Sequence, residues 1–176
     1  MAKFKPGYKK QSDGFMSSDN APRRRYHDTV KSVSEAFLDD SDINARGRNG
    51  FTALQTIIWS NSVDSVGLAA ELLRLGADPN IPCNEGWTPL HGAVKYGAVT
   101  LIQELLKHGA QINASQNEGR TPLLYAVERE QWDSVTILLQ NGANANICSY
   151  SGRSPLSEVA GYTEKEYLLR QYGARR

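Results

Sequence analysis

The chain has 176 residues, of which 40% are hydrophobic and 22% are charged, and its net charge is +1. This composition is typical of a folded protein and excludes wholesale disorder. The small net charge argues against a protein whose whole surface binds nucleic acid or membranes. Two cysteines are too few for a disulfide scaffold or an ordinary four-ligand zinc site. No apolar run approaches the roughly 20 residues of a membrane-spanning helix, and no signal peptide is predicted.

Charge is distributed unevenly along the chain. Residues 1–27 hold seven Lys and Arg residues against two Asp residues, a net charge of +5, whereas the remainder has 13 basic and 17 acidic residues, a net charge of −4. Two interpretations of this basic N-terminal arm stay open. It is either a flexible, solubilising tail or a nuclear-import or polyanion-binding segment built on the arginine triplet at 23–25.

An internal repeat organises the rest of the chain. The strings GFTALQ, GWTPLH, GRTPLL and GRSPLS begin at Gly50, Gly86, Gly119 and Gly152, at spacings of 36, 33 and 33 residues. Each is followed by an apolar stretch, a pair of leucines and a Gly-Ala dipeptide. A Thr or Ser before Pro predicts the capped start of a helix, and the later glycine predicts a left-handed end to a second helix. One such helix pair cannot bury its apolar face alone, so neighbouring units must stack.

This pattern resembles the ankyrin repeat, with the unit at residues 86–113 as the nearest match. The resemblance implies an all-α solenoid of stacked helix-turn-helix units joined by β-hairpin-like loops. It predicts an arm at 1–27 and a repeat domain at 28–176. The domain divides into a partial repeat at 28–48 and repeats at about 49–84, 85–117, 118–150 and 151–176.

The first and last units depart from the regular length. The first has three extra residues around 61–67, which predicts an enlarged turn between its helices. The last is two residues shorter, a difference we place between Thr163 and Gly173. Its second helix carries four charged residues, which fits a polar terminal cap: Glu164, Lys165, Glu166 and Arg170.

No catalytic or metal-binding constellation stands out in the sequence. In ankyrin repeats a histidine placed like His91 is a structural hydrogen-bonding group, and His108 precedes a predicted helix end. Cys83 and Cys148 lie on turns that two stacked layers would separate by about 20 Å, too far for a disulfide. We therefore expect no enzymatic activity, no cofactor and no metal.

The resemblance implies that a partner protein binds at the hairpin tips and the exposed ends of the first helices. Carried over by position, this surface holds six aromatic side chains among polar and charged ones, and aromatic residues and Arg dominate binding hot spots. The predicted protein-binding residues are Arg46, Arg48, Asn49, Phe51, Trp59, Asn84, Glu85, Trp87, Lys95, Tyr96, Asn117, Glu118, Arg120, Glu128, Arg129, Tyr150, Ser151, Arg153 and Tyr162. For each aromatic residue, packing within the array is the alternative.

The hairpin positions where the family commonly has Asp are occupied by other residues. Gly47, Cys83, Gln116 and Ser149 stand there, so we expect less regular hairpins. The loss of those carboxylates leaves four arginines prominent, which predicts a partner surface that is apolar with acidic patches: Arg46, Arg48, Arg120 and Arg153.

The function predicted from the sequence is a non-enzymatic protein-binding module that acts as an inhibitor, masking subunit or adaptor. One alternative is a nucleic-acid-associated or nuclear cofactor that uses the basic arm, and another is a secreted effector acting on a host protein. We expect a cytoplasmic protein, with the nucleus as the alternative location, that is monomeric when free. Membrane binding is not expected, and the partner's identity is not encoded by the repeat scaffold.

Overall fold

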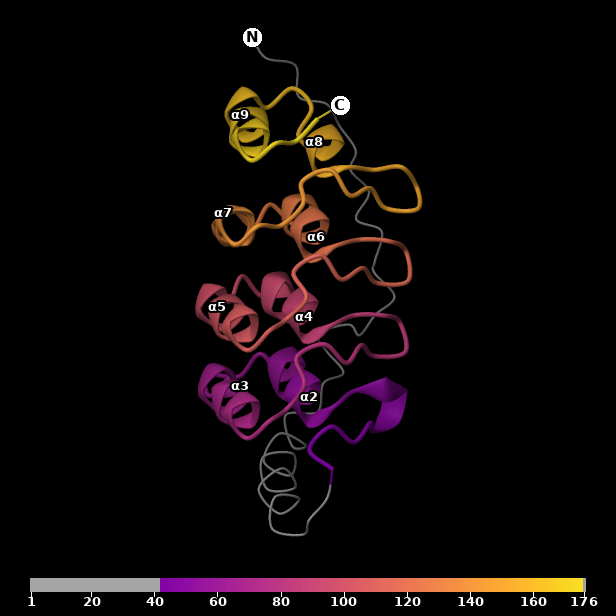
Figure 1. Ribbon diagram of the computed structural model, residues 1–176, viewed down its shortest axis with the longest axis vertical. Coiled ribbons are helices and arrows are strands. Elements are labelled where there is room, and N and C mark those ends of the chain that lie inside the picture. Colours follow the sequence, from indigo (N-terminus) through magenta and orange to yellow (C-terminus); the bar gives the residue numbers. More distant parts are fainter. Residues whose placement is uncertain (1–41, 176) are drawn as a thin grey trace.

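Residues 42–175 are described by a computed structural model, in which they form a stack of helix pairs (Figure 1). The basic arm and most of the predicted opening repeat lie outside the described residues. A 3₁₀ turn, η1, at Arg48–Gly50 precedes eight α-helices in this part of the chain. These are α2 Ala53–Ser60, α3 Ser65–Arg74, α4 Pro89–Lys95, α5 Val99–Lys107, α6 Pro122–Glu128, α7 Trp132–Gln140, α8 Pro155–Glu158 and α9 Thr163–Gln171.

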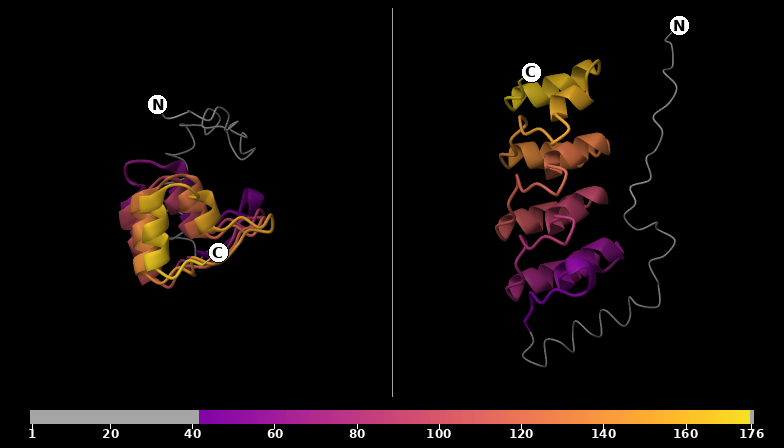
Figure 2. Two further views of the ribbon diagram at one scale, coloured as in Figure 1. Left: turned by 90° about the horizontal axis from the view of Figure 1, so that it is seen from above. Right: turned by 90° about the vertical axis from the view of Figure 1, so that its right-hand side faces the viewer.

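The helices form two parallel columns. The first helices of the units, α2, α4, α6 and α8, stack in one column, and the second helices, α3, α5, α7 and α9, stack in the other (Figure 1). Seen along the stack, the loops that join successive units all project to the same side (Figure 2). No strand is present between residues 42 and 175, so these hairpin-like loops are turns. The predicted all-α solenoid is confirmed.

Each first helix begins at the predicted hydroxyl residue. The side chains of Thr52, Thr121 and Ser154 accept hydrogen bonds from the backbone N–H three residues later, at 3.3, 3.2 and 3.1 Å. These bonds satisfy N–H groups that have no partner inside the helix. The second helices end at glycines with φ between 83° and 99°, the left-handed conformation that Gly adopts without steric cost.

Leucine, isoleucine, valine and alanine fill the space between the columns. Leu54, Leu90, Leu123 and Leu156 recur at the second position of each first helix and are all buried. The pairs Leu72/Leu73 and Leu138/Leu139 are buried on the second helices, whereas Leu106 and Leu168 are only half-buried beside the buried Leu105 and Leu169. Burial of each such side chain contributes about 1.5–3 kcal/mol.

The three extra residues of the first unit are shared among three elements. α2 has eight residues against seven in α4 and α6, α3 has ten against nine in α5 and α7, and the connecting turn is longer by the third residue. The expectation that all three enlarge the turn was therefore wrong in part. Helix ends can lengthen because solvent satisfies the added backbone groups.

The shortened part of the last unit also differs from the prediction. α9 has nine residues, like α5 and α7, whereas α8 has only four. The missing residues therefore come from the first helix and not from the segment between Thr163 and Gly173. The polar character of α9 agrees with the sequence: only Leu169 is buried within it, and Glu166 pairs with Arg170 at 3.6 Å.

Asparagines in the exit turns connect each unit to the next. The side-chain oxygens of Asn44, Asn80, Asn113 and Asn146 accept backbone N–H groups about 30 residues later, at 2.7–2.9 Å. The hydrogen bond from the Asp78 N–H to Asn44 is equivalent to the hydrogen bonds that Asn80, Asn113 and Asn146 accept. Residues 42–44 therefore have the geometry of a repeat's exit turn, and the boundaries of the opening repeat stay a prediction.

One glycine within a first helix makes room for a large side chain of the preceding unit. Gly92 is buried in α4, and a Cβ atom there would overlap the six-membered ring of Trp59. The Trp59 ring is also held by Phe51, with ring centroids 5.6 Å apart and an interplanar angle of 72°. Gly67 in α3 is exposed, with no atom near the corresponding Cβ position.

We expect Gly92→Ala and Gly67→Ala to change stability in opposite directions. Gly92→Ala forces the Trp59 ring to move and should reduce the free energy of unfolding by about 1–3 kcal/mol. Gly67→Ala should raise it by about 0.5–1 kcal/mol, because Ala reduces the entropy lost when an exposed helix forms. Urea unfolding of the two variants checks both signs. Equal effects would contradict the packing of Trp59 on Gly92.

Candidate functional site

The loop tips form a row along the stack, and backbone hydrogen bonds connect neighbouring tips. The N–H groups of Asn84, Asn117 and Tyr150 donate to the carbonyls of Asn49, Glu85 and Glu118 in the preceding tip, at 3.0, 3.2 and 3.0 Å. The described tips are therefore held in register by main-chain atoms, which leaves their side chains available for contact with another molecule.

The side chains of the tips point mostly into solvent. The predicted tip residues that are exposed are Asn49, Asn84, Glu85, Asn117, Glu118, Tyr150 and Ser151. Tyr150 is 80% exposed, the highest value of any aromatic residue among residues 42–175. Arg48 begins η1, and its side chain lies outside the described part of the structure.

The hairpins are more regular than the sequence suggested. At all four positions where Asp is absent, the backbone N–H bonds the carbonyl four residues later, at 2.8–3.1 Å, and the carbonyl accepts the N–H of the tip glycine. Gln116 and Ser149 add side-chain bonds to Glu118 N and Arg153 N. Gly47 and Cys83 need none, because the main-chain bonds alone close the turn. The expectation of irregular hairpins was wrong.

The first two units meet through aromatic and backbone contacts. Trp59 is half-buried between Phe51 and the next unit, where the Tyr96 hydroxyl donates to the Trp59 carbonyl at 3.1 Å. Burial raises the pKa of Tyr96. Lys95 lies 5.5 Å from the Tyr96 ring centroid. The structure thus brings together the residues predicted for this part of the surface, but the rings of Phe51 and Trp59 are partly buried by packing within the array.

An aromatic cluster lies at the centre of the face. The Trp87 ring meets Tyr125 edge-on at 4.9 Å and His91 at 5.4 Å between centroids. The guanidinium of Arg120 lies 5.5 Å from the Trp87 ring, and Arg129 donates from Nε to the Tyr125 hydroxyl at 3.2 Å. Tyr125 is buried and was not predicted as part of the site. Tyr125 occupies the position of Gly92 in the preceding unit. This difference in side-chain size was the sequence signal that could have identified Tyr125.

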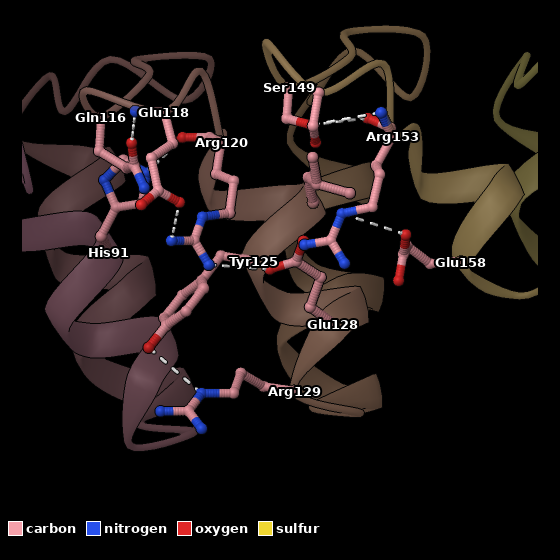
Figure 3. Close-up of polar contacts among 12 residues, drawn as sticks. His91, Gln116, Glu118, Arg120, Tyr125, Glu128, Arg129, Ser149, Arg153 and Glu158 are labelled. Carbon is pink, nitrogen blue, oxygen red and sulfur yellow. Dashed lines mark hydrogen bonds and ion pairs between the residues drawn. The ribbon is translucent and has the colours of Figure 1, made fainter. Parts of the chain in front are cut away.

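Ion pairs run from this cluster into the last unit (Figure 3). Arg120 pairs with Glu118 and, at 3.4 Å, with Glu128. Glu128 also pairs with Arg153 at 2.6 Å, and Arg153 Nε lies 3.6 Å from Glu158. Glu158 is a participant that the sequence analysis missed, because its partner Arg153 precedes it by five residues, a spacing that predicts no contact along a helix.

These ion pairs weaken the prediction of an acidic partner surface. Arg120 and Glu128 are only 14% and 10% exposed, and Arg153 is offset by Glu128 and Glu158. Arg46 bonds the carbonyls of Gly50 and Pro82 at 3.2 and 3.0 Å. The charges of Arg120 and Arg153 are thus largely offset within the array, and an acidic partner surface stays a prediction.

Burial and neighbouring charges both act on the Glu128 carboxylate at the centre of the ion pairs. Burial raises the pKa of Glu128, whereas Arg153 and Arg120 lower it and Glu158 raises it further. The folded chain therefore binds a proton at Glu128 more tightly than the unfolded chain does. The contribution of Glu128 to stability becomes more favourable as pH falls through this raised pKa.

His91 connects the second and third units from a fully buried position. Its Nδ1 atom faces the Thr88 N–H and hydroxyl, at 3.3 and 2.9 Å, and its Nε2 atom lies 3.0 Å from the Arg120 carbonyl. The structural role expected of His91 is confirmed. Burial lowers its pKa to about 4. Gln55 occupies the same place one unit earlier, accepting from Thr52 N and donating to the Trp87 carbonyl at 2.8 Å.

The remaining predicted residue, Tyr162, lies at the start of α9 and is 58% exposed. The ammonium of Lys165 is 4.8 Å from its ring centroid and 4.6 Å from that of Trp132. Lys165 and Trp132 were not predicted, because they belong to second helices. That the site residues bind a partner stays a prediction.

No assembled metal site is found in the described residues, where no three His, Cys, Asp or Glu side chains gather. Cys83 and Cys148 are free thiols, as their predicted separation required. None of the helices between residues 42 and 175 is long and apolar enough to span a bilayer.

Stacked helix pairs with an ordered row of loop tips define a helical repeat solenoid, a class of protein that offers an extended binding surface. Residues 65–149 match the family described as ankyrin repeats (3 copies). The chain thus contains ankyrin repeats. Repeats of this family are in general protein–protein interaction modules without enzymatic activity.

A curated relative is described as a probable serine/threonine-protein kinase of Dictyostelium discoideum. It is 36% identical over 73 residues, which is 42% of this chain and 9% of that protein. The similarity thus spans less than a tenth of the relative's length, and the activity in its name is not carried over to this chain.

We expect His91→Gln to reduce the acid sensitivity of the fold. Because the pKa of His91 is about 4 in the folded chain and near 6.5 in the unfolded chain, stability is lost as pH falls from 6.5 to 4. The loss attributable to His91 is about 3 kcal/mol. Glutamine can keep both hydrogen bonds, as Gln55 shows.

Urea unfolding at pH 7 and pH 4.5 measures this difference. His108→Gln, at the end of α5, is the control for removing one histidine. A His91→Gln variant with the same loss of stability between these pH values as the wild type would contradict the role assigned to His91.

Proposed function

We propose that this chain is a non-enzymatic module that binds a partner protein with the row of loop tips and the exposed ends of the first helices. It acts as an inhibitor, masking subunit or adaptor, and it works in a reducing compartment such as the cytoplasm. The observation that carries the proposal is the combination of a fixed backbone with exposed side chains at the tips. Hydrogen bonds between neighbouring tips restrain the loops, while Tyr150 remains 80% exposed.

This combination lowers the cost of binding. A loop that is ordered before it meets its partner loses little conformational entropy on association, so more of the contact energy appears as affinity. Tyrosine suits such a site, because its large ring has few rotatable bonds and its hydroxyl can form a hydrogen bond. Tyr150 and Tyr162 both meet these conditions on the proposed surface. The free thiols of Cys83 and Cys148 support a reducing environment.

Among the predicted residues, the two tyrosines are better probes than Phe51 or Trp87. The rings of Phe51 and Trp87 contact other aromatic rings of the array, so their removal would also destabilise the fold. The ring of Tyr150 contacts the tip glycine Gly119, and that of Tyr162 contacts Lys165. Two further tyrosines on the second-helix side, Tyr167 and Tyr172, are 66% and 40% exposed and provide a matched control.

We expect Tyr150→Ala/Tyr162→Ala to weaken partner binding at least tenfold, because truncation of a hot-spot Tyr costs more than about 1.4 kcal/mol. Tyr167→Ala/Tyr172→Ala should leave binding within twofold of the wild type. Partners are captured with the immobilised full chain, identified by mass spectrometry and titrated against each purified variant. A partner that binds both double variants equally well would show that it uses another surface.

A further inference from the structure

The three junctions between the described units use different chemistry at the same position. At the first junction Gln55 donates to the Trp87 carbonyl at 2.8 Å, and at the second His91 bonds the Arg120 carbonyl at 3.0 Å. At the third junction the corresponding residue is Leu124, which has no polar side-chain atom. The loop of the last unit therefore lacks the buried hydrogen bond that the preceding helix supplies elsewhere.

Charged contacts replace this buried hydrogen bond at the third junction. Glu128 at the end of α6 pairs with Arg153 at 2.6 Å, next to Glu158 of α8. On the second-helix side, Lys165 of α9 pairs with Glu130 at 3.8 Å and lies 4.6 Å from the Trp132 ring centroid. The exit-turn bonds of Asn146 to Gly173 and Arg175 are the neutral contacts that this junction shares with the others.

Apolar packing contributes less at this junction than at the other two. α8 has four residues, of which Pro155 and Leu156 are buried, and α9 buries only Leu169. α9 also packs less extensively on α7 than α5 does. Since buried apolar area supplies most of the stability of stacked repeats, the last helix pair is the one with the smallest such contribution.

We propose that the last helix pair, residues 154–175, docks onto the array as a separate cooperative unit and that ionic strength controls the docked fraction. Salt screens charges, with a Debye length of about 10 Å at 0.1 M and about 3 Å at 1 M. Undocking also exposes the carboxylate of Glu128 and the guanidinium of Arg153 to water, where salt ions stabilise their charges. The contacts described here for the first two junctions are hydrogen bonds and aromatic contacts, in which Arg46 and Arg120 meet neutral groups, so salt should affect these junctions less.

Docking would set the length of the exposed surface. Tyr162 belongs to the last helix pair and Tyr150 to the loop that leads into it. An undocked last unit would remove Tyr162 from the row, whereas the first three units would remain stacked. The inference concerns the chain alone and stands whether or not the proposed partner surface is correct.

Hydrogen exchange followed by mass spectrometry tests the proposal on the full chain. Between 0.05 M and 1 M NaCl, amides of α8 and α9 should exchange at least threefold faster relative to those of α4 and α5 in the same sample. The same response in all units, or none in α8 and α9, would overturn the proposal.

Variants identify the charges responsible. Glu128→Gln/Arg153→Met should cut the salt response of α8 and α9 by at least half, whatever its effect on absolute stability. Glu71→Gln/Arg74→Met removes an exposed pair of equal length, 2.6 Å, on α3 and should leave the response unchanged. If Glu128→Gln/Arg153→Met does not fold, Lys165→Met provides a second test at a partly exposed position. It should also reduce the salt response of α8 and α9. A full response in both Glu128→Gln/Arg153→Met and Lys165→Met would rule out control by these ion pairs.

Discussion

Backbone carbonyls in the loops of the second and third units accept hydrogen bonds from the unit that precedes them. The carbonyls of Trp87 and Arg120 lie in loops, and it is a side chain from the preceding first helix, Gln55 or His91, that reaches them. Each of these carbonyls also accepts a backbone N–H within its own loop, from Cys83 or Gln116, and the side chain of the preceding helix adds a second hydrogen bond. Stacking is therefore favoured by hydrogen bonding as well as by apolar burial, and a single helix pair would lack both contributions.

Much of this architecture could be predicted from the sequence, because it depends on residues close together in the chain. A Thr-Pro pair caps a helix within one turn, and a glycine ends one where a left-handed residue is needed. The hydrogen-bonding role of His91 was implied by the resemblance to ankyrin repeats, and the structure places its ring against Thr88, three residues earlier. The lengths of elements were harder to predict, since the three extra residues of the first unit were absorbed by two helices and a turn.

The arrangement of charges could not be predicted in the same way. Arg120, Glu128 and Arg153 are separated by 8 and 25 residues, and their pairing depends on which way each long side chain turns once the units are stacked. Sequence position placed all three on one face, but it could not show that they bind one another. The contact of Trp59 with Gly92 is similar, because each residue has an ordinary explanation when it is considered alone.

The bonds between neighbouring tips join main-chain atoms, so the distance from one tip to the next does not depend on the side chains there. Across the tips at 84–85, 117–118 and 150–151, Asn or Tyr is followed by Glu or Ser, and the same main-chain hydrogen bonds recur. Recognition chemistry can thus be exchanged one tip at a time without altering the spacing that a bound molecule must match. The fold separates the geometry of recognition from its chemistry, which makes this row a suitable place to redesign specificity.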